Sequence, residues 1–296
     1  SLDLSTNLNL HSFDCFYNNQ LSSLDLTKQS KLERLSCYNN SSLQTIDLYG
    51  ADSLNYLNCS YNNQLSSLDL TKQSKLEILI CNNNSSLQTI NLDGADSLNQ
   101  LNCSFNQLDT LDVSNNTNLK SLNCSNNQLT KLDVSNNLAL TNLDCSNNQI
   151  TDLDLQHNTN LISLYAGYNQ LQYVNLKNGN NINIGIGLNL SNNMQLNCIS
   201  VDDVGWSVAY WTFHAGIIDS WTYFSSNCNP IFGCTDSIAI NFDSSANLDN
   251  GTCCYISGCT DSIALNFDPN ACYDDNSCSY VTGCTSPAIT GLGVSN

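Results

Sequence analysis

The fold is decided by a stretch that reads Leu119-Lys-Ser-Leu122-Asn-Cys124-Ser-Asn-Asn127-Gln-Leu129-Thr-Lys-Leu132-Asp133-Val134. Written as a pattern it is LxxLxCxxNxLxxLDV, and its apolar residues alternate with polar ones around 122–124 and again around 132–134. Alternation with a period of two residues indicates a short β-strand that buries one face. The stretch therefore predicts two short strands whose apolar side chains point into one shared interior.

The same pattern recurs along the first two thirds of the chain. A cysteine occupies its third apolar site every 21 or 22 residues, at Cys15, Cys37, Cys59, Cys81, Cys103, Cys124 and Cys145. A fixed period in this range is typical of a solenoid, in which each turn buries its apolar face against its neighbours. Because these cysteines replace leucine, we expect buried, inert thiols in the core and not disulfides or metal ligands.

The pattern LxxLxCxxNxL resembles the leucine-rich repeat, and LxxLDV resembles the second half of its 21-residue subclass. The resemblance covers residues 2–190 and implies a mainly β fold, a parallel β-solenoid. In this family a stacked column of asparagines satisfies buried backbone groups at each corner. The resemblance implies that structural role for Asn18, Asn40, Asn62, Asn84, Asn106, Asn127, Asn148 and Asn169.

A second column is acidic, and it has two interpretations. Like charges on neighbouring strands are destabilising, so we expect other interactions of the carboxylates to offset this repulsion. We expect them to cap the turns that follow by accepting backbone N–H bonds; the alternative is a row of weak cation sites. The column consists of Asp25, Asp47, Asp69, Asn91, Asp112, Asp133, Asp154 and Asn175.

Composition excludes several classes of function. The 296 residues include 8 basic and 26 acidic side chains, a net charge of −18, which disfavours nucleic acid or an anionic membrane surface as partner. No apolar run is long enough to span a bilayer. His11, His157 and His214 lie in unrelated contexts without a nucleophile or metalloprotease motif, so we expect no enzyme activity.

The outward side of the first strands is the candidate binding face. Residues 21–62 and 65–106 are nearly identical copies, and their seven differences spare the leucines, cysteines and corner asparagines. Tyrosine among Asn and Ser suits recognition of a glycan or a protein, although an inert stalk would also be rich in Asn and Ser. The candidate ligand-binding residues are Arg34, Tyr38, Tyr56, Lys120, Tyr165 and Tyr168.

Three domains are expected: a solenoid over 1–190, a cap over 191–229 and cysteine-rich repeats over 230–296. A solenoid needs an atypical last unit to cover its open edge. We expect most aromatic residues of the cap to plug that end, with Cys198 bonded to Cys228; an aromatic platform for sugars is the alternative. The segment resembles the terminal cap of secreted bacterial leucine-rich repeat proteins.

The last domain repeats every 25 residues from Gly233-Cys234-Thr-Asp236, with a third copy cut short. Aligning the copies predicts the disulfides Cys234–Cys253, Cys259–Cys278 and, between units, Cys254–Cys272. Such small modules need disulfides or a metal to hold them. Calcium is one hypothesis and solvated acidic turns the other. The candidate calcium ligands are Asp243, Asn247, Asp249, Asp268, Asn270 and Asp274.

These GCTD units resemble the short cysteine repeats of adhesins and other surface proteins that gliding bacteria export by the type IX pathway. The resemblance implies an extracellular, outer-membrane-associated location and a sorting domain beyond Asn296. Nine cysteines from Cys198 onward also favour an oxidising compartment. We therefore expect a non-enzymatic binding or adhesion protein. The alternative is a structural spacer, or an accessory subunit docked to an outer-membrane protein complex.

Overall fold

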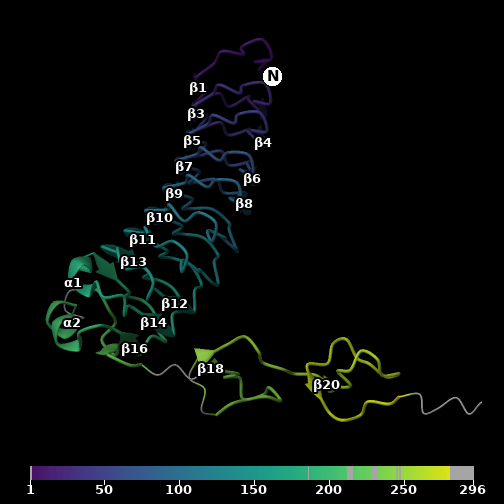
Figure 1. Cartoon of the computed structure of the whole chain (residues 1–296), viewed down its shortest axis with the longest axis vertical. Helices are drawn as coiled ribbons and strands as arrows, with labels where there is room; N and C mark the ends of the chain where they lie inside the picture. The colour runs from purple at the N-terminus through teal and green to yellow at the C-terminus, as the bar shows by residue number, and fades with distance from the viewer. Residues whose placement is uncertain are drawn as a thin grey trace, which may run out of the picture. The chain divides into compact units, whose positions relative to one another are not determined.

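The computed structural model describes residues 2–185, 187–211, 216–228, 232–244, 246 and 248–280. Two compact units divide the chain, Ser1–Cys228 and Asn229–Asn296. The first is a stack of similar turns, which Figure 1 shows as successive loops of chain coloured from purple to green. Within the described residues no helix has the length and apolar character needed to cross a bilayer.

One continuous parallel sheet runs along the solenoid. Each turn contributes one strand, and equivalent residues pair, as Leu35 does with Leu57 and Leu57 with Leu79. This register follows from the repeat, because a slip of one residue would turn the leucines outward. The strands, in spatial order, are β1 (Ser12–Asp14), β3 (Arg34–Ser36), β5 (Tyr56–Asn58), β7 (Ile78–Ile80), β9 (Gln100–Asn102), β10 (Ser121–Asn123), β11 (Asn142–Asp144), β13 (Ser163–Tyr165) and β15 (Leu188–Asn189).

The opposite side of the solenoid is less regular. Its strands form two pairs and one group of four: β2 (Ser23–Asp25) with β4 (Thr45–Asp47), β6 (Ser67–Asp69) with β8 (Thr89–Asn91), and β12 (Asp152–Asp154), β14 (Tyr173–Asn175), β16 (Cys198–Ser200) and β17 (Tyr223–Ser225). The prediction of two strands in every turn is therefore wrong for residues 110–112 and 131–133, which form none. Pairing also lapses between β4 and β6, where the spacing is 22 residues, and it resumes between β12 and β14, where the spacing is 21. Repeat length alone therefore does not decide where these strands pair.

The core consists of the leucines and the cysteine column. Cys37 and the five cysteines after it have no exposed surface, and Cys15 in the first turn is 7% exposed. Burial raises the pKa of Cys15 to about 11 and that of Cys59 and Cys103 to about 12. All seven are free thiols. The prediction of buried cysteines without disulfides is confirmed, and at neutral pH they carry no nucleophilic thiolate.

The asparagine column holds the turns together through three kinds of hydrogen bond. Asn62 Nδ2 donates to the carbonyls of Cys59 (2.7 Å) and, one turn back, of Cys37 (3.0 Å). Its Oδ1 accepts the backbone N–H of Asn40 at 2.8 Å. The side chain thus satisfies groups that leave the ladder at the corner. The structural role that the resemblance implies is confirmed.

The acidic column caps turns. Asp25 Oδ1 accepts the backbone N–H of Thr27 at 2.9 Å, and Asp112 Oδ1 accepts that of Ser114 at 2.9 Å. Hydrogen bonds to the backbone and side chain of Thr27 lower the pKa of Asp25, and hydrogen bonds to the side chain and backbone of Ser114 lower the pKa of Asp112. The same two-residue bond recurs at Asp47, Asp69, Asn91, Asp133, Asp154 and Asn175. The capping interpretation is confirmed for every member of the column.

The C-terminal end of the solenoid is closed by α1 (Asn181–Ile184), α2 (Val204–Tyr210) and strands β16 and β17. Trp211 follows α2 and is fully buried, and its Nε1 donates to Gly185 O at 2.6 Å. Phe224 packs 5.9 Å from it, between ring centroids. Among the six described aromatic residues of the cap, Trp206, Trp211 and Phe224 pack against the core, whereas Tyr210, Trp221 and Tyr223 are exposed. The expectation that most aromatic residues plug the end stays a prediction. Phe213 and His214 lie outside the described residues.

The second unit contains two similar modules, each with a two-stranded parallel sheet: β18 (Phe232–Gly233) with β19 (Leu248–Asp249), and β20 (Ser257–Gly258) with β21 (Tyr273–Asp274). The disulfides are Cys234–Cys253 and Cys259–Cys278 within modules and Cys254–Cys272 between them. These are the pairs that the alignment of the copies predicts. The expected bond Cys198–Cys228 is also present in the cap. Cys284 lies outside the described residues.

Candidate functional site

The N-terminal part of the candidate face brings two predicted residues together. Arg34 in β3 pairs in register with Tyr56 in β5, and its guanidinium carbon lies 3.8 Å from the centre of the tyrosine ring. A cation over an aromatic face is held by the ring quadrupole. Arg34 therefore covers one face of the Tyr56 ring. A ligand could contact the guanidinium group and the opposite face of the ring.

Tyr38 belongs to an aromatic cluster that the sequence did not single out. Its ring stacks on Phe16 with centroids 4.8 Å apart, and Tyr17 meets it edge to face at 5.7 Å. Phe16 is 41% exposed and Tyr17 is 67% exposed. Stacked and edge-to-face pairs hold rings in fixed positions. The cluster is a rigid apolar patch beside the first strands of the sheet.

The other predicted face residues lie further along the solenoid. Lys120 directly precedes β10, Tyr165 ends β13, and Tyr168 follows three residues later; all three side chains are exposed. Because β5 and β10 are separated by β7 and β9 in the sheet, Lys120 lies three ladder steps from Tyr56, about 14 Å. The six residues thus share one face but form two groups, not one compact site.

A third feature of this face is a column of residues with left-handed backbone conformation. They lie two positions after each of the seven stacked cysteines and two positions after Ala166 and Leu190, which take the place of the cysteine in the next two turns. Asparagine occupies five of these sites, at Asn39, Asn83, Asn126, Asn147 and Asn192. Aromatic residues occupy the other four: Tyr17, Tyr61, Phe105 and Tyr168, with φ between 56° and 58°. Sequence reasoning included only Tyr168. The sequence offered one signal: at the same site of successive repeats, aromatic residues replace an asparagine, and asparagine adopts the left-handed conformation readily.

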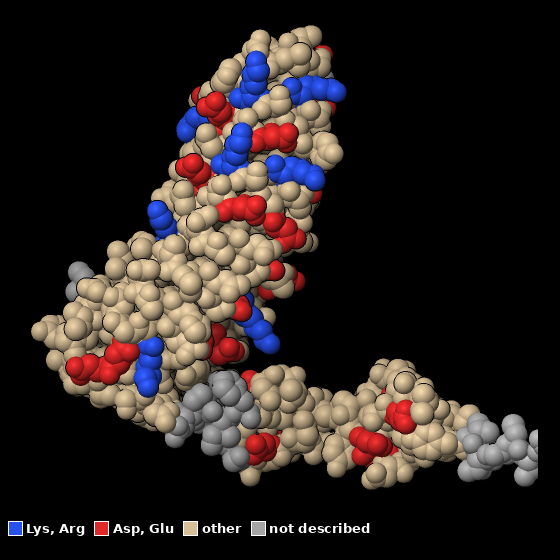
Figure 2. Space-filling model, viewed as in Figure 1, with Lys and Arg blue, Asp and Glu red and all other residues tan. Residues whose placement is uncertain are grey.

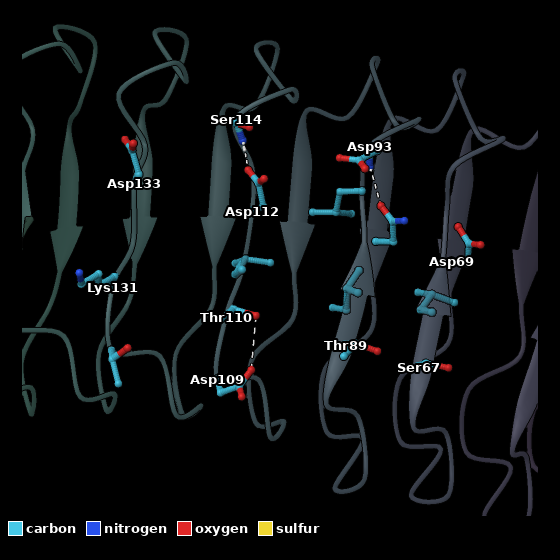
Figure 3. Close-up of a pocket in the computed structure, with 16 residues that line it drawn as sticks. Ser67, Asp69, Thr89, Asp93, Asp109, Thr110, Asp112, Ser114, Lys131 and Asp133 are labelled. Atoms are coloured by element: carbon cyan, nitrogen blue, oxygen red, sulfur yellow. Dashed lines mark hydrogen bonds between the residues drawn. The ribbon is translucent and has the colours of Figure 1, made fainter. Parts of the chain in front are cut away.

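The opposite side of the solenoid is hollowed over the paired strands β6 and β8 and over the next two turns, which form no strand there. A groove of about 890 Å³ crosses four successive turns, and Figure 3 shows carboxylates along it, with Asp109 and Asp112 on one turn and Lys131 and Asp133 on the next. Its acidic side chains are largely engaged in local hydrogen bonds, as Asp112 is with Ser114. The acidic side chains of the groove are spread over successive turns and do not converge on one point.

The candidate calcium ligands make similar local bonds. Asp249, Asp268 and Asp274 each accept the backbone N–H of the residue two positions later, at 2.9–3.0 Å. Asn247 lies outside the described residues. Among the residues that the structure describes, no group of three or more His, Cys, Asp or Glu side chains could hold a metal ion. Calcium binding by the modules stays a prediction, and thermal melting with and without a chelator tests it.

Charge is distributed unevenly along the chain. All eight basic residues lie between Lys28 and Lys177. Figure 2 shows basic and acidic side chains interspersed over the N-terminal turns of the solenoid, and acidic ones alone over the described parts of the modules. A mixed, net acidic surface gives no electrostatic attraction for a phosphate backbone.

Comparison with known proteins agrees with this geometry. A family model described as Leucine Rich repeats (2 copies) matches residues 117–157. The functional domain of InlJ from Listeria monocytogenes, which includes a cysteine ladder, is similar in structure with a TM-score of 0.51 and 30% sequence identity. The solenoid is built of leucine-rich repeats.

The similarity to InlJ covers 68% of this chain and 52% of the InlJ chain, so this chain matches about half of that structure's length. An internalin (inlF) from Listeria monocytogenes is 17% identical, with 69% of this chain and 70% of that chain covered and a TM-score of 0.35. No curated protein matches. The leucine-rich repeats of this chain share with InlJ a column of stacked cysteines, which here are seven buried thiols.

Proposed function

We propose that this protein is an extracellular, non-enzymatic adhesion protein that binds a protein or glycan at the bacterial cell surface. The binding surface would be the outward side of the continuous sheet that runs from β1 to β15, which we call the first-strand face. The exposed aromatic residues on that face carry the proposal. Tyr17, Phe16 and Tyr165 are each more than 40% exposed on a side of the solenoid where the polar neighbours are mostly Asn and Ser. Exposed aromatic area among amides and hydroxyls is the composition of recognition surfaces.

Two further observations support this proposal. The similar InlJ structure is described as a functional domain, and leucine-rich repeats form extended surfaces suited to binding. The four disulfides support an oxidising, extracellular compartment. We also propose export by the type IX pathway and attachment to the outer membrane, and this part rests only on the resemblance of the GCTD units. Protease accessibility on intact cells tests that part.

The duplicated repeats supply the variants that test binding. Tyr38→Asn and Tyr56→Gln replace each tyrosine by the residue at the same place in the second copy, Asn82 or Gln100, which the fold already accommodates. The double variant should stay folded with a cooperative melt, at a slightly lower temperature because the Phe16 and Arg34 contacts are lost. It should lose binding to the ligand found on a glycan array or in a pull-down from the native membrane. Tyr49→Asp, which copies Asp93 in the same way, changes an exposed tyrosine on the opposite side and should retain binding.

The rival function is a structural spacer or an accessory subunit of an outer-membrane complex. A spacer has no ligand to lose, so unchanged array and pull-down profiles for the double variant would favour it. A subunit would recover an outer-membrane protein in the pull-down, and that recovery would survive both tyrosine changes if the contact lies elsewhere. The two outcomes separate the rival function from adhesion through the first-strand face.

A further inference from the structure

The left-handed column carries exposed aromatic rings at positions that disfavour them. Tyr61, Phe105 and Tyr168 have φ of 56–57° and side chains that are 48%, 53% and 57% exposed. A bulky residue in the left-handed region is an outlier, whereas asparagine adopts it readily. An aromatic residue at these sites therefore costs backbone stability, and its exposed side chain contributes little burial to offset that cost. Strain of this kind at a surface points to an interaction outside the chain.

Successive members of the column lie one turn of the solenoid apart. The N–H of Tyr61 donates to Asn82 O at 3.0 Å and that of Phe105 donates to Ser125 O at 2.9 Å, so the ladder continues through these residues. Aromatic residues 44 positions apart, such as Tyr61 and Phe105, lie two ladder steps apart, about 9.6 Å. Asn83 occupies the step between them. Rings and amides thus alternate from Tyr17 to Phe105, whereas two amides, Asn126 and Asn147, separate Phe105 from Tyr168.

The band around the middle of this column is uncharged. From one residue before the cysteine to four residues after it, the turns at 36–41, 58–63, 80–85, 102–107 and 123–128 contain no Asp, Glu, Lys or Arg, whereas the turns at 14–19 and 144–149 each contain one aspartate, Asp14 or Asp144. In a chain of net charge −18 this neutrality is local. It favours a neutral ligand over a polyanion or a basic protein surface.

We propose that Tyr17, Tyr61, Phe105 and Tyr168 form a binding track for a neutral, extended, β-linked polysaccharide that runs along the solenoid axis. The inference rests on the proposed binding function and specifies its ligand. A β-linked hexose unit in an extended chain is about as long as one step of a β-ladder. A sugar over Tyr61 then places the next sugar at Asn83 and the third over Phe105. A ligand with a translational repeat fits a track with the same repeat, which a globular protein surface lacks.

The chain itself supplies a variant that separates binding from folding. Tyr61→Asn combined with Phe105→Asn installs the residue that neighbouring turns carry at the same site, and it relieves the backbone strain. The double variant should melt at the same or a higher temperature than the wild type. Its affinity for cellohexaose or chitohexaose, measured by isothermal titration calorimetry on the full chain, should fall about tenfold or more. Tyr49→Asp is the matched control and should bind as the wild type does.

Ligand length gives an independent readout. Cellobiose reaches one ring, cellotriose reaches both Tyr61 and Phe105, and cellopentaose adds Tyr17, so affinity should rise in two steps with length. Laminarihexaose, whose β-1,3 linkages curve the chain, should bind more weakly than cellohexaose because its units fall out of step with the ladder.

The following results would contradict the proposed binding track. Equal binding by the wild type and by Tyr61→Asn/Phe105→Asn would overturn it, as would affinity independent of ligand length. If none of these oligosaccharides binds while Tyr38→Asn/Tyr56→Gln abolishes binding to a surface protein, the track is wrong and the proposed adhesion function stands. If no glycan and no protein binds to the wild type, both are wrong.

Discussion

At the scale of single residues, the corner asparagines stabilise the solenoid through buried hydrogen bonds. Asn62→Ala removes the partner of the Cys37 and Cys59 carbonyls and of the Asn40 N–H, all in a buried region. Buried backbone groups left without partners cost about 1–3 kcal/mol each. We therefore expect the free energy of unfolding in urea to fall by about 3 kcal/mol or more. The exposed neighbour offers a control: Asn63→Ala should change it by less than about 0.5 kcal/mol, and equal losses would contradict the ladder's role.

The buried thiols make stability depend on alkaline pH. Burial raises the pKa of Cys59 and Cys103 from 9.0 in the unfolded chain to about 12. Above pH 9 the unfolded state loses these protons and the folded state keeps them, so stability is complete below pH 9 and falls as pH rises toward 12. Each thiol contributes up to about 1.4 kcal/mol per pH unit. Cys59→Ala/Cys103→Ala should show a shallower decline in urea unfolding between pH 9 and 11, and an identical decline would contradict this account.

Residue type and spacing predicted the buried positions correctly, but they did not reveal the sign of φ. The cysteine and asparagine columns are visible in the sequence because burial and amide bonding depend on side-chain chemistry. The left-handed sites depend on how the chain leaves each strand. Tyr61 and Phe105 look like ordinary surface residues until the backbone shows that Asn39 and Asn83 share their conformation.

At the scale of secondary-structure elements, the two sides of the solenoid should differ in local stability. Strands β9 and β10 are paired in the continuous sheet, whereas 110–112 and 131–133 on the opposite side of the same turns form no strand. Amide hydrogens without a ladder partner exchange faster. Hydrogen exchange read by mass spectrometry should therefore be faster in 110–112 than in 100–102, and faster in 131–133 than in 121–123. Equal protection on both sides would show that the ladder is closed in solution.

The repeat pattern predicts two strands per turn because LxxLDV alternates in every copy. Whether a second strand forms also depends on the distance between neighbouring turns, which the pattern does not encode. The repeat period does not reveal it either, because β12 and β14 pair at a spacing of 21 residues whereas β4 and β6 stay apart at 22. The candidate face was foreseen as a face, but its division into a group around Arg34 and a group around Tyr165 follows from strand order.

At the scale of the whole molecule, two different forces stabilise the two units. The solenoid has a continuous core of leucines and unoxidised cysteines, so its stability comes from apolar burial. The modules expose apolar residues that a larger domain would bury: Ile238 and Ile263 are both 79% exposed. Modules of this size depend on cross-links. The chain therefore contains a unit that should tolerate reductant and a unit that should not.

Reduction of the folded protein tests this division. Treatment with a thiol-free reductant should make the modules sensitive to limited proteolysis while the solenoid keeps a cooperative melt. The solenoid should lose only the contribution of Cys198–Cys228, whose closed loop of 30 residues is worth about 3.6 kcal/mol, or roughly 7–14 °C in melting temperature. Cys198→Ala/Cys228→Ala should begin at that lower temperature and shift no further when reduced. A further shift in this variant would mean that the module disulfides stabilise the solenoid too, because its own seven cysteines are already thiols.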